Sequence, residues 1–125
     1  MPVRVASCRV VNTPLSEDVA TLPVSDVATL MSVSVSRVHQ FVRDGQLLAL
    51  RHDGATVVPA DFLDGGAVIK GLPGTITVLR DGGYSDEEIL RWLFAEDDSL
   101  PGTPVASLRA GRHREVKRRA QAMAF

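Results

Sequence analysis

The stretch VSDVATLMSVSVSRVHQFVR, residues 24–43, decides the fold, because apolar residues recur at helical spacing on both sides of a short break. Its first half places four small or apolar side chains on one helix face: Val24, Val27, Ala28 and Met31. Residues 32–33 interrupt this spacing with a serine and an apolar valine. The pattern predicts two short helices joined by a tight turn, which is a helix-turn-helix unit.

The second half of the stretch begins at Ser34, whose hydroxyl is suited to cap the N-terminus of a helix. Val38, Phe41 and Val42 recur at the spacing of a buried face. The opposite face is polar and basic, and Arg, Gln and Ser side chains bind base edges or phosphates in DNA grooves. We therefore predict that DNA is bound by Ser34, Ser36, Arg37, His39, Gln40 and Arg43. The alternative is a helical hairpin packed only for stability.

A β-hairpin is predicted directly after the second helix. Residues 47–52 favour a strand, residues 53–54 are the Asp-Gly pair of a two-residue turn, and residues 55–58 are rich in β-branched side chains. A hairpin in this position is the wing of a winged helix. Arg51 and His52 flank its tip, where they would reach a phosphate or the minor groove; the alternative for each is a solvated side chain.

The stretch from Leu22 to Leu47 is similar to the helix-turn-helix of excisionase-like and MerR-like winged-helix proteins. The matching positions are Ala28, the turn Ser32-Val33, Val38, Phe41 and the closing Arg43-Asp44-Gly45-Gln46-Leu47. Ser32 stands where that family usually has glycine, so a left-handed backbone there would cost roughly 1 kcal/mol. The resemblance implies a winged helix that binds DNA.

The second half of the chain is predicted to be helical. Apolar residues recur at helical spacing over residues 72–79, and residues 85–88, Ser-Asp-Glu-Glu, have the form of a capping box. We expect a last helix with Thr103 as its N-cap and Pro104 as its first residue, which carries apolar side chains as far as Met123 and is interrupted at Gly111. Acidic side chains gather in residues 81–98 and basic ones in the last helix. The two either pair with each other, within the chain or across a dimer, or the basic helix follows a phosphate backbone.

Two further resemblances concern this half. Its motif positions are similar to the C-terminal helical domain of Xre-MbcA-ParS antitoxins: Trp92-Leu93, Leu100, Gly102, Pro104, Leu108, Gly111 and Val116. The chain from Leu22 to Phe125 is similar to small actinobacterial winged-helix DNA-binding proteins that are substrates of serine/threonine protein kinases, chiefly through LPGTITVLRDGGYSDEEILRWLF and REVKRRAQAMAF. This resemblance implies DNA binding, a helical C-terminal domain and an N-terminal arm open to phosphorylation. Hydroxyl groups within that arm belong to Ser7, Thr13, Ser16 and Thr21.

Composition limits the chemistry that the chain can perform. An apolar content of 45% supports a packed core, and a net charge of −1 requires any DNA-binding charge to be local. Cys8 is the only cysteine, so it has no disulfide partner within the chain. His39, His52 and His113 fall in different predicted elements, and no glycine-rich phosphate loop or nucleophile elbow occurs. We expect no catalysis, no cofactor and no metal.

We predict a mainly α fold with a small β-hairpin, in three parts: a flexible N-terminal arm (1–21), a winged helix-turn-helix (22–66) and a C-terminal helical domain (67–125). The recognition helix would span about residues 34–43 and the wing about residues 47–58. No apolar run approaches the roughly 18 residues of a membrane span, and none resembles a signal peptide, so we expect a cytoplasmic protein without a membrane partner.

The predicted function is sequence-dependent binding of double-stranded DNA by a transcriptional regulator. A homodimer and a serine/threonine protein kinase are the other expected partners. The alternative is a protein-interaction module, either antitoxin-like or a kinase-regulated adaptor, that acts through its C-terminal helices.

Overall fold

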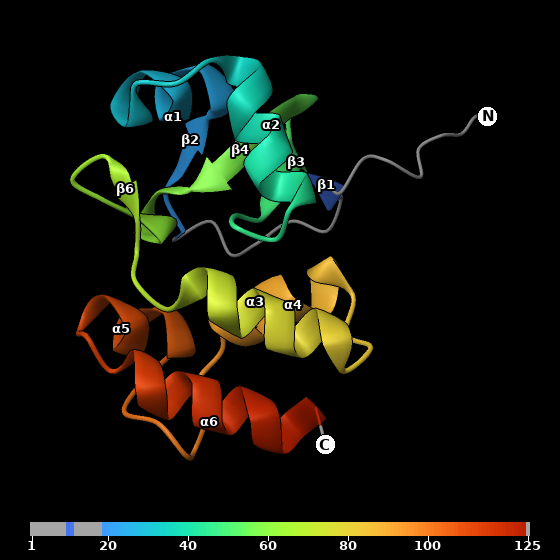
Figure 1. Cartoon of the computed structure of the whole chain (residues 1–125), viewed down its shortest axis with the longest axis vertical. Helices are drawn as coiled ribbons and strands as arrows, with labels where there is room; N and C mark the ends of the chain where they lie inside the picture. The colour runs from blue at the N-terminus through green and yellow to red at the C-terminus, as the bar shows by residue number, and fades with distance from the viewer. Residues whose placement is uncertain (1–9, 12–18, 125) are drawn as a thin grey trace.

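The computed structural model describes residues 10–11 and 19–124 of the chain. Figure 1 shows two layers, which we call the winged lobe, residues 10–11 and 19–68, and the helical lobe, residues 69–124. The winged lobe holds two helices and the main sheet, and the helical lobe holds four helices. A winged helix-turn-helix followed by a helical region, as predicted, is therefore confirmed.

The main sheet has four strands in the order β1-β3-β4-β2. The predicted hairpin forms its centre, with β3 (Ala49–His52) antiparallel to β4 (Ala55–Pro59). On one side β1 (Val10–Val11) runs parallel to β3, and on the other β2 (Thr21–Pro23) runs antiparallel to β4. The sheet is therefore larger than the two-stranded hairpin that the sequence predicts.

The predicted N-terminal arm, residues 1–21, contributes to the main sheet at two places. Val10–Val11 forms β1, and Thr21 begins β2. Strands of two or three residues are too short to show an alternating pattern, so pairing with the hairpin, and not local sequence, determines them. Ser7, Cys8, Thr13 and Ser16 lie outside the described residues.

The predicted helix-turn-helix is confirmed, with α1 (Val24–Met31) and α2 (Val35–Arg43) joined at Ser32. Ser32 has a left-handed backbone, with φ 59° and ψ 42°. Its N–H and that of Val33 donate to carbonyl oxygens in the last turn of α1, which satisfies the end of that helix. Ser32 therefore has the left-handed backbone that glycine would adopt more easily, at the position where the similar winged-helix families usually have glycine.

A short connection leads from the sheet to the helical lobe. A single 3-10 turn, η1 (Ala60–Phe62), follows β4. The strands β5 (Leu63–Asp64) and β6 (Ala67–Val68) then pair as a small antiparallel hairpin. The connection is short and packed, which keeps the two lobes in contact.

The helical lobe consists of α3 (Leu72–Asp81), α4 (Asp86–Leu93), α5 (Pro104–Arg109) and α6 (His113–Ala124). Figure 1 shows α3 and α6 side by side, and their contacts are the most extensive between any two elements. The predicted last helix is thus two helices, because Gly111 turns the chain between them with φ +87°. The inner side of α6 is buried against the lobe.

Both predicted helix starts in this lobe are confirmed. Ser85 and Glu88 form a full capping box: the Ser85 Oγ accepts from the Glu88 N–H at 3.1 Å, and the Ser85 N–H donates to Glu88 Oε1 at 2.9 Å. The Ser85 N–H bond is the first cause of a lowered pKa of Glu88, since it stabilises the carboxylate. Thr103 caps α5, where its Oγ1 accepts from the Ala106 N–H at 3.2 Å.

One hydrophobic core runs through both lobes. Leu47, Leu48 and Phe62 of the winged lobe are fully buried, and the Phe62 ring lies 5.6 Å, centroid to centroid, from Phe94 of the helical lobe. Burying such surface is the main favourable term in folding, so each lobe stabilises the other. No helix within the described residues is long and apolar enough to cross a membrane.

Candidate nucleic-acid interface

The start of α2 is capped but open to solvent. The Ser34 backbone is extended, and its Oγ accepts a hydrogen bond from the Arg37 N–H at 3.1 Å, which confirms the predicted N-cap. The hydroxyl proton of Ser34 remains free to donate to an acceptor. A helix N-terminus carries partial positive charge and unpaired N–H groups, so this end of α2 suits an anion such as a phosphate.

One side of α2 is exposed along its whole length. Val38 and Val42 are buried and Phe41 is half-buried, as the sequence predicts for the inner side. The residues predicted to contact DNA are exposed, with one exception: Ser34, Ser36, Arg37, Gln40 and Arg43 are exposed, and His39 is half-buried. The helix therefore presents a polar side that no other described part of the chain covers.

Arg37 and Gln40 are connected on this side. The Arg37 Nη1 donates to Gln40 Oε1 at 3.1 Å, and the guanidinium lies 5.0 Å from the centroid of the Phe41 ring. Stacking on an aromatic ring and a side-chain hydrogen bond both reduce the conformations available to an arginine. The pair thus forms a partly ordered polar surface, with the Gln40 amide N–H groups still available as donors.

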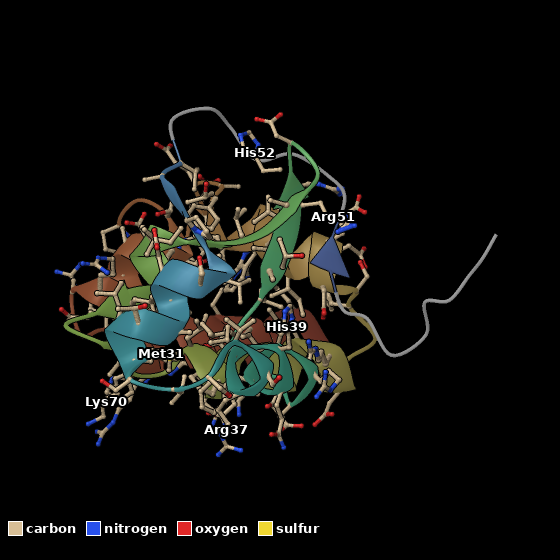
Figure 2. The ribbon with its side chains drawn as sticks, turned by 90° about the horizontal axis from the view of Figure 1, so that it is seen from above. Met31, Arg37, His39, Arg51, His52 and Lys70 are labelled. Carbon is tan, nitrogen blue, oxygen red and sulfur yellow. The ribbon has the colours of Figure 1, made fainter. Side chains whose placement is uncertain are left out.

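The predicted residues of α2 extend from its start to its end. Figure 2 shows Arg37 pointing away from the sheet, whereas His39 lies on the side of α2 that faces it. Ser34 and Ser36 stand at the start of α2, and Arg43 is its last residue, at the end that meets the helical lobe. Ser36, Gln40 and Arg43 thus follow one another along the exposed side of α2, and His39 stands apart from them.

The wing tip is exposed. Asp53 and Gly54 both have positive φ, 53° and 80°, which is the two-residue hairpin turn that the sequence predicts. Arg51 and His52 are exposed on β3, and His52 Nε2 lies 3.4 Å from Asp53 Oδ2. In Figure 2 the wing tip and Arg37 lie on opposite sides of the view. The wing tip and Arg37 are therefore not neighbours on the surface.

Two apolar side chains at the elbow of the helix-turn-helix are absent from the predicted contacts. Leu30 is 51% exposed and Val35 is 43% exposed, and they are the exposed large apolar side chains among the described residues. Val35 is the first residue of α2, between two serines. Apolar side chains at such positions contact the methyl group of thymine in the major groove. In the sequence, Val35 could have been recognised as an exposed apolar residue, because it does not share the helical spacing of the buried Val38 and Val42.

Comparison with known proteins supports this geometry. Residues 9–63 match the family described as "DNA-binding protein Rv2175c, wHTH domain", and residues 69–124 match "Rv2175c C-terminal domain of unknown function". The chain is 44% identical to the DNA-binding protein Rv2175c of Mycobacterium tuberculosis, over 98% of this chain and 92% of the relative. The chain belongs to the Rv2175c family. An NMR structure of Rv2175c matches it with a TM-score of 0.85 and 41% identity, over 100% of both chains.

In this member of the Rv2175c family, part of the basic last helix pairs with the acidic stretch. The Arg119 Nε donates to Asp97 Oδ2 at 3.1 Å, which confirms at this position the pairing within the chain that the sequence left open. Asp97 also accepts from Trp92 Nε1 at 3.0 Å and from the Ser99 N–H at 2.8 Å. These bonds, led by the one from Trp92, lower the pKa of Asp97 from 3.8 to about 2.

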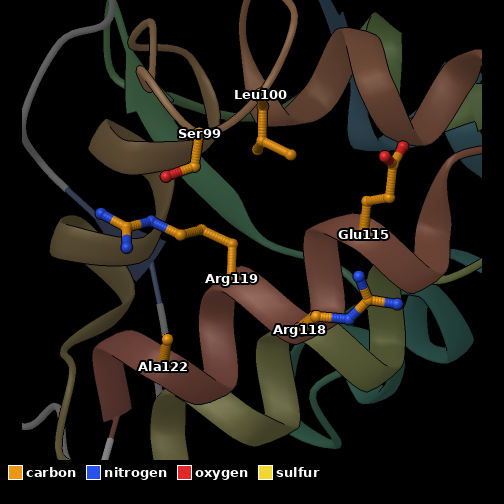
Figure 3. Close-up of a pocket in the computed structure, with 6 residues that line it drawn as sticks. All are labelled: Ser99, Leu100, Glu115, Arg118, Arg119 and Ala122. Atoms are coloured by element: carbon orange, nitrogen blue, oxygen red, sulfur yellow. The ribbon is translucent and has the colours of Figure 1, made fainter.

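The helical lobe also has a shallow hollow of about 250 Å³, which Figure 3 shows between α6 and the loop before α5. It is lined by Ser99, Leu100, Glu115, Arg118, Arg119 and Ala122. The hollow lies in the lobe opposite the start of α2 (Figure 1). Within residues 10–11 and 19–124, no three His, Cys, Asp or Glu side chains converge as metal ligands would.

Proposed function

We propose that the protein binds double-stranded DNA in a sequence-dependent manner and regulates transcription. The observation that carries the proposal is the capped, solvent-open start of α2 with its uncovered polar side, in a chain whose family is described by a DNA-binding winged helix. A recognition helix enters the major groove by its N-terminal residues, and here that end is the one free of the helical lobe.

Each side chain of α2 has a separate task in this proposal. The Ser34 hydroxyl and the N–H groups after it hold a phosphate, while Ser36, His39 and Gln40 probe base edges. Val35 contacts a thymine methyl group. Arg37 and Arg43 supply positive charge on the two sides of the groove. Arg51 and His52 of the wing contact the neighbouring backbone or the minor groove.

Few cations are available, so a single copy binds weakly, in the range of about 10⁻⁴ to 10⁻⁶ M typical of non-specific binding. A two-fold homodimer would place two recognition helices about 34 Å apart, one turn of DNA, and would raise the affinity for a palindromic site. Sedimentation of the protein with and without such a duplex tests the dimer; a single copy on every bound duplex contradicts it.

The central test uses a site obtained by selection and sequencing of bound DNA. We expect Gln40→Ala to reduce the preference for the selected site over a scrambled duplex, because its amide reads a base. We expect Arg43→Ala to weaken binding to both duplexes alike, because it contributes charge. Equal effects of the two variants on selected and scrambled DNA contradict these roles, and failure to enrich any site contradicts sequence-dependent binding.

A kinase as a regulatory partner is a second part of the proposal. The N-terminal residues would accept the phosphate, which adds close to two negative charges to a protein that has few cations to attract DNA. We expect Thr13→Glu to lower DNA affinity. Unchanged affinity of this variant counts against regulation at that position.

A protein partner for the helical lobe is the other candidate function. The observation that favours it is a stripe of exposed cations on α6, Arg114, Lys117 and Arg118, which form no ion pair with any described residue. A gel-shift assay on genomic fragments, in dilute buffer and at about 0.3 M salt, separates the two functions. Salt-sensitive binding to particular fragments supports DNA binding, and no binding under either condition favours the protein partner.

A further inference from the structure

We propose that Arg80 is a positioning residue, through which the helical lobe fixes the C-terminal end of α2 and so the orientation of its DNA-reading side. This gives a role to a domain that its family description leaves without one. The inference rests on the proposed function, because it concerns how α2 is held for sequence-dependent DNA binding.

Arg80 connects the two lobes by a set of directed hydrogen bonds. It lies in the last turn of α3, and its side chain is only 15% exposed. Its Nε and Nη2 donate to the two carboxylate oxygens of Asp86, each at 2.8 Å. The Nη2 also donates to the carbonyl oxygen of Val42, in the last turn of α2, at 3.3 Å. The bidentate pair with Asp86 fixes the plane of the guanidinium and therefore the direction of the bond to Val42.

The charges along this connection alternate in sign. The C-terminal end of α2 carries partial negative charge, Arg80 is positive, and Asp86 is negative. Asp86 is in turn the first residue of α4, where the helix carries partial positive charge. Each neighbour therefore attracts the next, from the recognition helix to the middle of the helical lobe, in a region that is largely shielded from water.

Gly45 leaves the space that this arrangement needs. It is buried two residues after the end of α2 with φ +81°, and a Cβ at this position would lie 2.9 Å from Arg80 Nη1. The position therefore requires glycine for its backbone and also for the approach of the guanidinium. The absence of a side chain at Gly45 thus allows the Arg80 guanidinium to lie close to the C-terminal end of α2.

Positioning of this end matters because α2 is a short rod. It has nine residues, and its start is the part that enters the groove in the proposed function. A change of tilt at Val42 moves the side chains at the start, and hydrogen bonds to base edges tolerate only small displacements. Contacts to phosphates depend mainly on charge and distance, so they tolerate the same movement better.

The chain offers a matched control in Arg109. This arginine lies in the last turn of α5 and also joins the lobes, because its Nη1 donates to the carbonyl oxygens of Asp61 and Leu63, each at 2.9 Å. Its acceptors belong to η1 and β5, and not to α2. Loss of either arginine weakens the contact between the lobes, but only Arg80 contacts the recognition helix.

The experiment compares Arg80→Lys with Arg109→Lys in the full chain. Lysine keeps the charge but cannot form the bidentate pair and reach Val42 in the same geometry. We expect Arg80→Lys to lower the ratio of affinities for selected and scrambled duplex about tenfold, within the range of long-range coupling effects, and Arg109→Lys to leave the ratio unchanged. Amide exchange is measured alongside, and we expect faster exchange of the Asp44 and Gln46 N–H groups in Arg80→Lys alone.

An unchanged ratio in Arg80→Lys overturns the inference, as does an equal fall in both variants, which would mean that any loosening of the lobes has this effect. If the unmodified protein shows no preference between the duplexes, the proposed function fails. Amide exchange then decides whether Arg80 holds α2: faster exchange of the Asp44 and Gln46 N–H groups in Arg80→Lys alone supports it, and identical exchange in the two variants contradicts it.

Discussion

The helices α2 and α6 both have basic outer sides, yet they lie in opposite lobes (Figure 1). Exposed cations number two on α2, Arg37 and Arg43, and three on α6, Arg114, Lys117 and Arg118. The start of α2 is open to solvent, whereas the start of α6 packs closely: a Cβ added at Gly71 would lie 2.3 Å from the Cβ of His113. In the proposed function, the two helices are therefore distinguished by whether the helix start is accessible, and not by their number of charges.

The largest expected effect tests whether α6 is mainly structural. Val116 of α6 is fully buried, and Val116→Ala removes two methyl groups from the core, so we expect a loss of about 2 kcal/mol in the free energy of unfolding. Val35→Ala on α2 is the matched change at an exposed valine, with an expected loss below about 0.5 kcal/mol. Urea denaturation measures both. Similar losses of stability for the two valines would contradict the contrast between a structural α6 and an exposed start of α2.

The next effect concerns charge. We expect Arg37→Gln to weaken DNA binding about tenfold and to reduce the slope of log affinity against log salt by about 1, because one phosphate contact is lost. Lys117→Gln removes an equally exposed cation from α6 and should leave both quantities unchanged. Fluorescence anisotropy between about 50 and 200 mM salt gives both quantities. An equal loss of DNA affinity and of salt slope in Lys117→Gln would indicate that α6 contacts DNA as well.

A smaller effect compares two helix caps. Ser34 caps α2 and Thr103 caps α5 by the same type of bond. We expect Ser34→Ala and Thr103→Ala each to cost about 1 kcal/mol of stability, measured by thermal denaturation. Only Ser34→Ala should also weaken DNA binding, since only that cap lies at the proposed phosphate site. If both variants bind DNA as well as the unmodified protein, Ser34 is a structural cap alone.

The smallest effect is a dependence on pH within the helical lobe. The bond from Trp92 is the first cause that holds the pKa of Asp97 at about 2, below its ordinary 3.8. A group whose pKa is lowered by folding stabilises the folded state at pH above its unfolded value, and this contribution is lost as the pH falls from about 4 to 2. We expect Asp97→Asn to flatten the stability profile in that window, because the variant lacks the carboxylate whose charge these bonds stabilise. An unchanged profile by acid titration followed by Trp92 fluorescence would assign the acid sensitivity to other groups.

Much of the fold followed from short-range patterns. The buried side of α1, the turn at Ser32, the cap at Ser34 and the capping box at Ser85 were all predicted, because each depends on residues within four positions of one another. The strands β1 and β2 were missed, since their position depends on pairing with a distant hairpin. The interruption at Gly111 was expected, but the sequence did not show that it produces two separate helices.

The candidate site was predicted less completely than the fold. Exposure of the polar side of α2 followed from helical spacing, but spacing along a helix does not say which end of it meets another lobe. The sequence therefore grouped Arg43 with Ser34, although the two stand at opposite ends of α2. Arg80 was not singled out, because its role comes from a carbonyl oxygen 38 residues away along the chain.

The close fit of Gly45 against the Arg80 guanidinium limits how this protein can be recombined with others. A chimera that takes residues 22–66 from one parent and residues 67–125 from another would lose the contact between the two lobes at this point, unless the first parent has Gly45 and the second has Arg80. The two halves are consecutive in sequence and look exchangeable, but they would have to be inherited, or engineered, as a single unit.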